Sequence, residues 1–244
     1  MSTAIKIRSA ATLITCCRIN RQISNGDDVA KSDYNVLLLK RSKNMKSFSS
    51  NHVFPGGKFD ESDASPKWLK VFSKSQIRYD HLKELIFENV NRPSVYSSLA
   101  SSKNIDLNKQ LPLEISYRLC AIREQFEETG LLIASRNNSS AVPCGERKKF
   151  ASFILEKDLL KWLTRIRENS DEFINMFLEH NICPDIFALH DWSSWLTPVV
   201  EKSRFDTIFY SCFLNEIPIV NNFEVNSDES SKLEVNKFCN SFTK

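Results

Sequence analysis

Residues 112–129 constrain the fold more than any other part of the chain. Apolar residues recur there at intervals of three and four, which places side chains on one face of an α-helix: Ile115, Leu119, Ile122 and Phe126. Gly130 follows where helices commonly end in the left-handed conformation that glycine adopts easily. The pattern therefore predicts a helix over 112–129 with an apolar face buried against other elements.

Short apolar runs before and after this helix have the length and composition of β-strands. They are residues 11–18, 35–41, 52–54, 192–200 and 205–214. Residues 149–180 predict one or two further amphipathic helices. This mixture of strands and helices indicates an α/β or α+β fold, a mixed β-sheet with helices on its faces.

We interpret 1–244 as a single domain, because a chain of this length holds one sizeable core. Residues 64–112 form an insertion with partly helical spacing, which we expect to lie as a separate layer outside the sheet. Residues 219–244 form a poorly patterned tail.

The composition excludes several classes of protein. A net charge of +3 is too small to indicate nucleic acid as the main partner, and no apolar run reaches the roughly 20 residues that span a bilayer. The seven cysteines contain no C-x-x-C pair, which favours free thiols over a zinc site. Residues 10–17 read as a strand, with a mitochondrial presequence as the alternative.

Three carboxylates, Glu124, Glu127 and Glu128, share the arc of the predicted helix opposite its apolar face. Unpartnered, such carboxylates repel one another and destabilise the helix. A hard divalent cation, Mg²⁺ or Mn²⁺, removes this conflict because it prefers oxygen ligands. The alternative is a solvated acidic face on which Arg123 forms a surface ion pair.

Glycine is scarce in this chain, and its distribution favours a site over a solvated face. Three of the five glycines, Gly56, Gly57 and Gly130, bracket the predicted helix and the turn upstream of it. Glycine is needed where the backbone approaches a ligand closely or takes a positive φ angle.

Gly57, Asp63 and the run from Arg123 to Leu131 together resemble the Nudix box, G-x5-E-x7-R-E-U-x-E-E-x-G-U, in which U is aliphatic. Three departures stand out. Asp63 replaces a glutamate, Gln125 replaces an aliphatic residue, and the spacer over 64–122 has 59 residues instead of seven.

A long insertion at this place is similar to that of the Nudix motif 19 group, peroxisomal hydrolases of coenzyme A and its acyl esters in mammals. The resemblance covers about residues 10–218 and implies a Nudix fold, with a mixed sheet between helices. It implies that Glu124, Glu127 and Glu128 bind Mg²⁺ or Mn²⁺ and that Glu124 is the candidate base. Arg123 would orient a glutamate, with Asp63 as an accessory residue.

The segment before the box partly matches a pattern found in Nudix enzymes that act on coenzyme A. Arg41 and the Phe-Pro-Gly-Gly run ending at Gly57 fit it, and Lys46 stands for its second arginine. The match implies that Arg41, Lys46, Gly56 and Gly57 contact substrate; an ordinary basic loop after a strand is the alternative. The tryptophan-rich run over 183–198 also resembles this group, and by itself it reads as core packing.

The resemblance implies a small-molecule substrate and a defined product. Cleavage of the diphosphate of coenzyme A or acyl-coenzyme A gives adenosine 3′,5′-bisphosphate and (acyl)phosphopantetheine. Two alternatives stay open: a truncated, catalytically impaired protein that binds a nucleotide or a partner, and a hydrolase of another nucleoside diphosphate derivative. The group is peroxisomal, but residues 240–244 are not a peroxisomal address, so a cytoplasmic or mitochondrial location is also expected.

Overall fold

The computed structural model describes residues 7–18, 34–41, 51–86, 106–137, 148–201, 203–216, 218 and 233–239. Its strands are β1 (Ile7–Arg18), β2 (Tyr34–Arg41), β3 (His52–Val53), β4 (Gly56–Lys58), β5 (Ala134–Arg136), β6 (Ile182–Pro184), β7 (His190–Leu196), β8 (Arg204–Leu214) and β9 (Leu233–Cys239). Its α-helices are α1 (Trp68–Lys74), α2 (Tyr79–Lys83), α4 (Leu113–Thr129), α5 (Lys157–Leu160), α6 (Leu163–Glu168) and α7 (Asp171–His180). Two 3₁₀ helices, η1 (Glu61–Ala64) and η3 (Ile186–Ala188), complete the described elements.

Seven strands form the main sheet in the order β3-β2-β1-β8-β7, with β4 paired to β1 and β9 paired to β2. The pair β1–β8 is parallel over 11 residue positions, and the other pairs are antiparallel. The expected mixed sheet with helices is therefore confirmed. In the tail, β9 pairs with β2, a contribution that the weak pattern of 219–244 did not predict.

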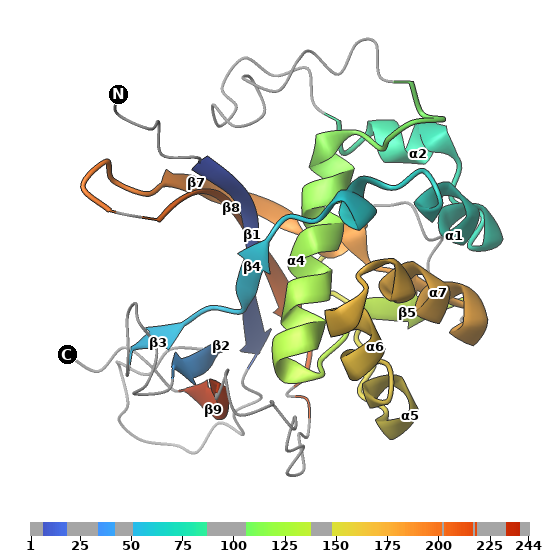
Figure 1. Ribbon diagram of the computed structural model, residues 1–244. Helices are drawn as coiled ribbons and strands as arrows, with labels where there is room; N and C mark the ends of the chain where they lie inside the picture. The colour runs from blue at the N-terminus through green and yellow to red at the C-terminus, as the bar shows by residue number, and fades with distance from the viewer. Residues whose placement is uncertain are drawn as a thin grey trace, which may run out of the picture.

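Helix α4 lies between the sheet and the remaining helices, and the described helices lie on this one side of the sheet (Figure 1). Gly130 ends α4 with a φ of 72°, as its position predicted. The sequence predicted burial of one apolar face of α4, whereas polar residues on its other faces are buried as well. Polar residues such as Arg118 and Gln125 are as buried as Leu119, because they lie against the sheet, where Arg118 pairs with Asp191 of β7 and Gln125 accepts from Thr15 of β1.

The insertion leaves and rejoins the fold at one point. The backbone N–H of Leu111 donates to the carbonyl oxygen of Ala64 over 2.8 Å, so the ends of the inserted segment are neighbours. A long insertion closed in this way adds little strain to the elements on either side of it. No described residue of 64–112 lies in a strand.

The insertion packs against α7 and joins the main core. The indole of Trp68 contacts the rings of Phe173 and Phe177 edge-on, at 5.7 and 5.3 Å between centroids. Phe173 in turn stacks on Phe126 of α4 at 6.1 Å. The described apolar residues of the insertion therefore lie outside the sheet and join the core that α4 and α7 form.

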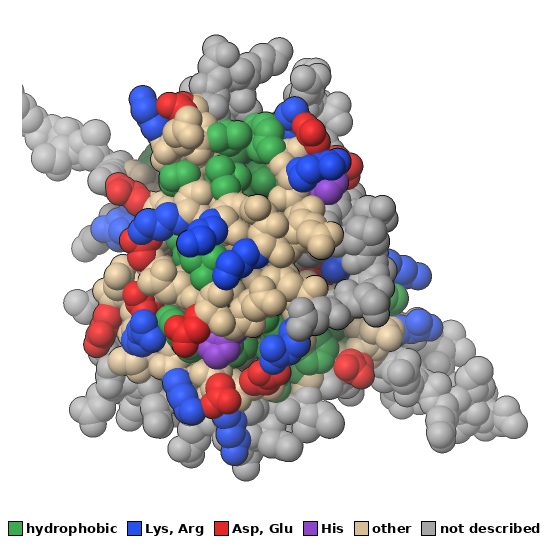
Figure 2. Space-filling model, turned by 90° about the vertical axis from the view of Figure 1, so that its right-hand side faces the viewer, with side chains coloured by type: hydrophobic (Ala, Val, Ile, Leu, Met, Phe, Trp, Pro, Cys, Tyr) green, Lys and Arg blue, Asp and Glu red, His purple; other side chains and the backbone are tan. Residues whose placement is uncertain are grey.

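The surface on the helical side carries charges of both signs. Figure 2 shows lysine, arginine, aspartate and glutamate side chains intermixed over this face. None of the described helices is long and apolar enough to cross a membrane. The cysteines whose side chains the structure describes, Cys16, Cys17, Cys120, Cys183 and Cys212, are free thiols.

Candidate active site

The turn at Gly56 and Gly57 presses the backbone of β4 against both β1 and α4. A Cβ atom on Gly56 would lie 2.6 Å from the carbonyl oxygen of Ala11, and one on Gly57 would lie 2.3 Å from a carboxylate oxygen of Glu124. The N–H of Gly56 donates to Oε2 of Glu128 over 2.9 Å. Both glycines are therefore required for close approach, and each faces a carboxylate of α4.

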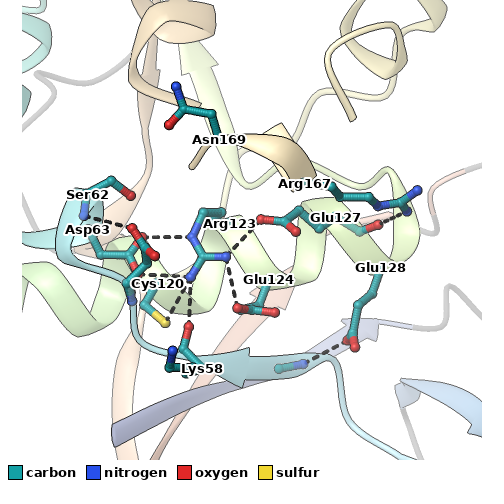
Figure 3. Close-up of polar contacts among 12 residues, drawn as sticks. Lys58, Ser62, Asp63, Cys120, Arg123, Glu124, Glu127, Glu128, Arg167 and Asn169 are labelled. Atoms are coloured by element: carbon teal, nitrogen blue, oxygen red, sulfur yellow. Dashed lines mark hydrogen bonds and ion pairs between the residues drawn. The ribbon is translucent and has the colours of Figure 1, made fainter. Parts of the chain in front are cut away.

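Arg123 is the centre of a buried polar network (Figure 3). Its Nε and Nη2 donate to the two oxygens of Asp63, both over 2.9 Å, in a bidentate ion pair. Its Nη1 donates to Glu124 over 2.9 Å and to Glu127 over 2.8 Å, and Nη2 also donates to the carbonyl oxygen of Lys58. The arginine thus joins the two halves of the split motif, with Asp63 as its principal partner.

Burial dominates the electrostatics of these carboxyl groups. It raises the pKa of Glu124 to about 7 against the opposing charge of Arg123, and the charge of Glu127 raises it further. Burial also raises the pKa of Glu128 to about 8, although the hydrogen bond from Gly56 opposes the rise. Burial lowers the pKa of Arg123, but the charge of Asp63 outweighs it and the pKa rises above its usual range.

The three carboxylates expected to bind metal do not converge as the chain stands. Glu124 and Glu127 are turned toward Arg123, whereas Glu128 is turned toward Gly56 (Figure 3). Within the described residues, no three Asp, Glu, His or Cys side chains are grouped as they are around a metal ion. A cation at this place would therefore require at least one glutamate to rotate away from its present partner.

Gln125, which stands where the motif has an aliphatic residue, is matched by a polar partner on the sheet. The hydroxyl of Thr15 donates to Oε1 of Gln125 over 2.5 Å, and both side chains are completely buried. Cys212 Sγ lies 3.5 Å from the same hydroxyl. A buried hydrogen bond between β1 and α4 thus replaces the apolar contact that an aliphatic residue at position 125 would make.

A pocket of about 620 Å³ opens beside Glu128. It lies where the sheet divides, because β4 pairs with β1 at Ala10–Thr12 and β2 pairs with it only at Cys16–Arg18. The lining residues are Thr12, Ile14, Arg41, His52, Val53, Phe54, Gly56, Glu128, Trp192, Ser193, Trp195, Thr207 and Phe209. The structure thereby brings Arg41 and Gly56 to one cavity with Glu128, while Lys46 lies outside the described residues.

The tryptophans of β7 are not core residues, so the interpretation of that run as core packing is wrong for these two side chains. Trp192 and Trp195 are each 67% exposed and line the pocket. They stand three positions apart, whereas strand residues on one face are two apart. A register shift between Asp191 and Ser193 allows both side chains to reach one face. The sequence pattern does not predict this shift.

The sequence is similar to one defined family over almost its whole length. Residues 7–243 match the family described as the NUDT19 Nudix domain. A Xenopus laevis protein named acyl-coenzyme A diphosphatase NUDT19 is 35% identical over 239 residues, which cover 90% of this chain and 60% of that protein. A Homo sapiens protein of the same name is 34% identical over 193 residues, which cover 77% of this chain and 50% of that protein.

These relatives are longer than the chain, which spans about half to three fifths of their length. Among solved structures, a NUDIX hydrolase from Alicyclobacillus acidocaldarius has a similar fold, with a TM-score of 0.52 and 21% identity. The similarity covers 88% of this chain and 72% of that one. At this level of identity the similarity concerns the fold alone.

Proposed function

The chain belongs to the NUDT19 Nudix domain family, and on that premise we propose that it hydrolyses the diphosphate of coenzyme A or acyl-coenzyme A. Water attacks one phosphorus atom and the bridging P–O bond breaks, which leaves adenosine 3′,5′-bisphosphate and (acyl)phosphopantetheine. The observation that carries this proposal is the position of Glu128, which both lines the 620 Å³ pocket and accepts a hydrogen bond from Gly56.

Nudix hydrolases generally need divalent metal ions, and the residues of α4 fit such an ion. Glu124 and Glu128 are buried carboxyls with raised pKa values, so a nearby dication would relieve the cost of ionising them. We propose Glu124, Glu127 and Glu128 as the ligands of Mg²⁺ or Mn²⁺. When bound, the ion supplies charge neutralisation of the diphosphate and lowers the pKa of a coordinated water.

In the rest of the network, one residue is proposed to act on water and two are proposed to position the carboxylates. Glu124 is proposed as the base on the family resemblance, and its buried carboxylate lies against Gly57 and Arg123. Arg123 is proposed to orient Glu124 and Glu127, since its guanidinium contacts both carboxylates and is only 4% exposed. Asp63 holds that guanidinium through two hydrogen bonds.

Arg41 is proposed to hold the 3′-phosphate of the nucleotide, together with Lys46. The buried Nε of Arg41 has no hydrogen-bond partner in the part of the chain that the structure describes, and the side chain lines the pocket beside Glu128. A fixed guanidinium suits a phosphate because it presents several donors in a plane.

A peroxisomal location is proposed on the family resemblance, and fractionation of cells that express the tagged protein tests it.

Product analysis tests the function directly. We expect the purified chain to convert coenzyme A to adenosine 3′,5′-bisphosphate with Mg²⁺ or Mn²⁺ and to do so negligibly with excess EDTA. Faster cleavage of a nucleoside diphosphate sugar or a dinucleotide than of coenzyme A would contradict the substrate assignment.

A second candidate, nucleotide binding without turnover, is favoured by one observation. Glu124 and Glu127 are hydrogen-bonded to Arg123 instead of converging on a common point. Binding of coenzyme A without product, at saturating Mg²⁺ and Mn²⁺, would support this second candidate over hydrolysis.

A further inference from the structure

Two indole rings stand largely in solvent at the mouth of the pocket. Trp192 and Trp195 are each 67% exposed on β7, the strand at one end of the sheet (Figure 1). Leaving such large apolar rings in water is unfavourable unless a ligand or partner covers them. Their place beside the pocket that also contains Arg41 and Glu128 indicates a ligand.

The backbone of β7 is shaped so that both rings reach one cavity. Trp195 pairs with Thr207 and Ser193 pairs with Phe209, and all four residues line the pocket, so they share one face of the sheet. In an unbroken strand Trp192 would point to the opposite face. The bulge immediately before Ser193 adds a residue, and Trp192 lines the pocket as well. Bulges commonly redirect a side chain beside a site.

We propose that Trp192 and Trp195, which we call the indole ledge, stack on the nucleobase of the substrate, while Arg41 holds a phosphate of the same nucleotide. This inference rests on the proposed function, because it assigns the adenosine part of coenzyme A to the pocket. A flat base stacked on exposed rings can keep its other face in water. An acyl or pantetheine chain gains most from an enclosed apolar channel, and the rings of the ledge are two-thirds exposed.

The partner residue in the pocket supports a nucleotide in particular. The Nε of Arg41 is buried and is left without a hydrogen-bond partner among the described residues, which is costly unless an anion binds there. A phosphorylated ribose joins an anion to a planar base in a single ligand. The ledge and Arg41 therefore match the two chemical ends of one nucleotide.

Metal-free binding of adenosine 3′,5′-bisphosphate, measured by calorimetry in EDTA, tests the ledge without turnover. We expect Trp195→Leu and Trp192→Leu each to raise the Kd about tenfold, and the double variant to raise it about a hundredfold. Trp195→Phe keeps an aromatic face and is expected to stay within about threefold of the parent. Val200→Ser is the matched control, since Val200 is 83% exposed near the same strand and is not part of the pocket lining.

The second ligand in the experiment is 4′-phosphopantetheine, whose binding the Leu variants should leave unchanged. Loss of phosphopantetheine binding with unchanged nucleotide binding would assign the ledge to the pantetheine part of coenzyme A and overturn the proposal. Equal nucleotide affinity in all variants, or a parent chain that does not bind the bisphosphate, would overturn it as well.

Failure of the ledge and failure of the proposed hydrolysis give different results. If the Leu variants lose bisphosphate binding while the parent chain forms no product from coenzyme A, the result contradicts the hydrolysis alone. A chain that cleaves coenzyme A while its Leu variants bind the bisphosphate normally contradicts the ledge alone.

Discussion

Two arginines lie near Glu128 and Glu124, and their surroundings are opposite. Arg123 is buried, with hydrogen bonds from three guanidinium nitrogens to Asp63, Glu124 and Glu127. Arg41 lines an open pocket, and its buried Nε has no hydrogen-bond partner in the described part of the chain. The same residue type therefore stands in a completed network at one place and in an incomplete one at the other.

The difference shows which charges serve the fold and which are available to a ligand. Removing Arg123 leaves a group of buried carboxylates uncompensated, whereas removing Arg41 leaves a pocket with less positive charge. Glu128 lies between the two regions, because it contacts the Gly56 turn and also lines the pocket. Substitutions in the two regions should consequently separate loss of stability from loss of binding.

The largest effect is expected for Arg123→Leu. Breaking a buried ion pair by removing one partner costs about 3–5 kcal/mol, because the remaining charge stays buried. We expect a decrease of that size in the free energy of unfolding, measured by urea denaturation at pH 8. The decrease should be smaller at pH 5.5, where Glu124 binds a proton.

Arg136→Leu is the matched control for Arg123. The Arg136–Glu156 ion pair is about half exposed on both sides, at 52% and 45%, and exposed pairs contribute about 1 kcal/mol or less. Equal destabilisation by the two substitutions would show that the Arg123 network has no special role in the fold.

The next effect concerns turnover. Glu127→Gln and Glu128→Gln are each expected to lower kcat on coenzyme A by at least about a hundredfold, because each removes a charge that a divalent ion requires. Both amides retain an oxygen that can accept the hydrogen bonds from Arg123 and Gly56, so the unfolding midpoint should change little. Near-normal rates in saturating Mg²⁺ would show that neither carboxylate is a metal ligand that turnover requires.

A smaller effect follows from the raised pKa values of Glu124 and Glu128. Unfolded glutamate ionises near pH 4.3, whereas the folded groups keep their protons to about 7 and 8. The folded state therefore binds more protons in this range, and stability falls as pH rises through it. Below pH 4.3 both states are protonated and this stability is fully present.

Thermal unfolding in EDTA between pH 5 and 8.5 measures this dependence. Mn²⁺ should raise the Tm more at pH 8 than at pH 5.5, since it binds the ionised carboxylates. A Tm that is flat or rises with pH in EDTA would contradict burial as the main cause of the raised pKa values of Glu124 and Glu128.

Much of the fold was visible in the sequence because local patterns determined it. The apolar stripe of 112–129 and Gly130 predicted α4, and the short β-branched runs predicted β1, β2 and β8. Asp63 was expected near Arg123 only through the resemblance, since 59 residues separate them and no local rule connects such distant positions. The hydrogen bond between Leu111 and Ala64 explains how that distance closes.

The sequence was less informative where tertiary pairing decides the outcome. Trp192 and Trp195 were assigned to the core, because large aromatics are usually buried and a bulge depends on the partner strand. The free Nε of Arg41 and the orientation of Glu124 toward Arg123 likewise depend on neighbours that are remote in sequence. The first two features belong to the pocket and the third to the Arg123 network, so sequence patterns predict side-chain surroundings least in both regions.

The most direct test of the contrast between the two arginines is Arg41→Ala, assayed on coenzyme A and on its analogue without the 3′-phosphate. A charged hydrogen bond contributes about 1.5–3 kcal/mol, so we expect kcat/KM for coenzyme A to fall about ten- to a hundredfold. The analogue should lose less than about threefold, and the free energy of unfolding should change by no more than about 0.5 kcal/mol. Equal losses on both substrates, or a destabilisation as large as that of Arg123→Leu, would contradict the account.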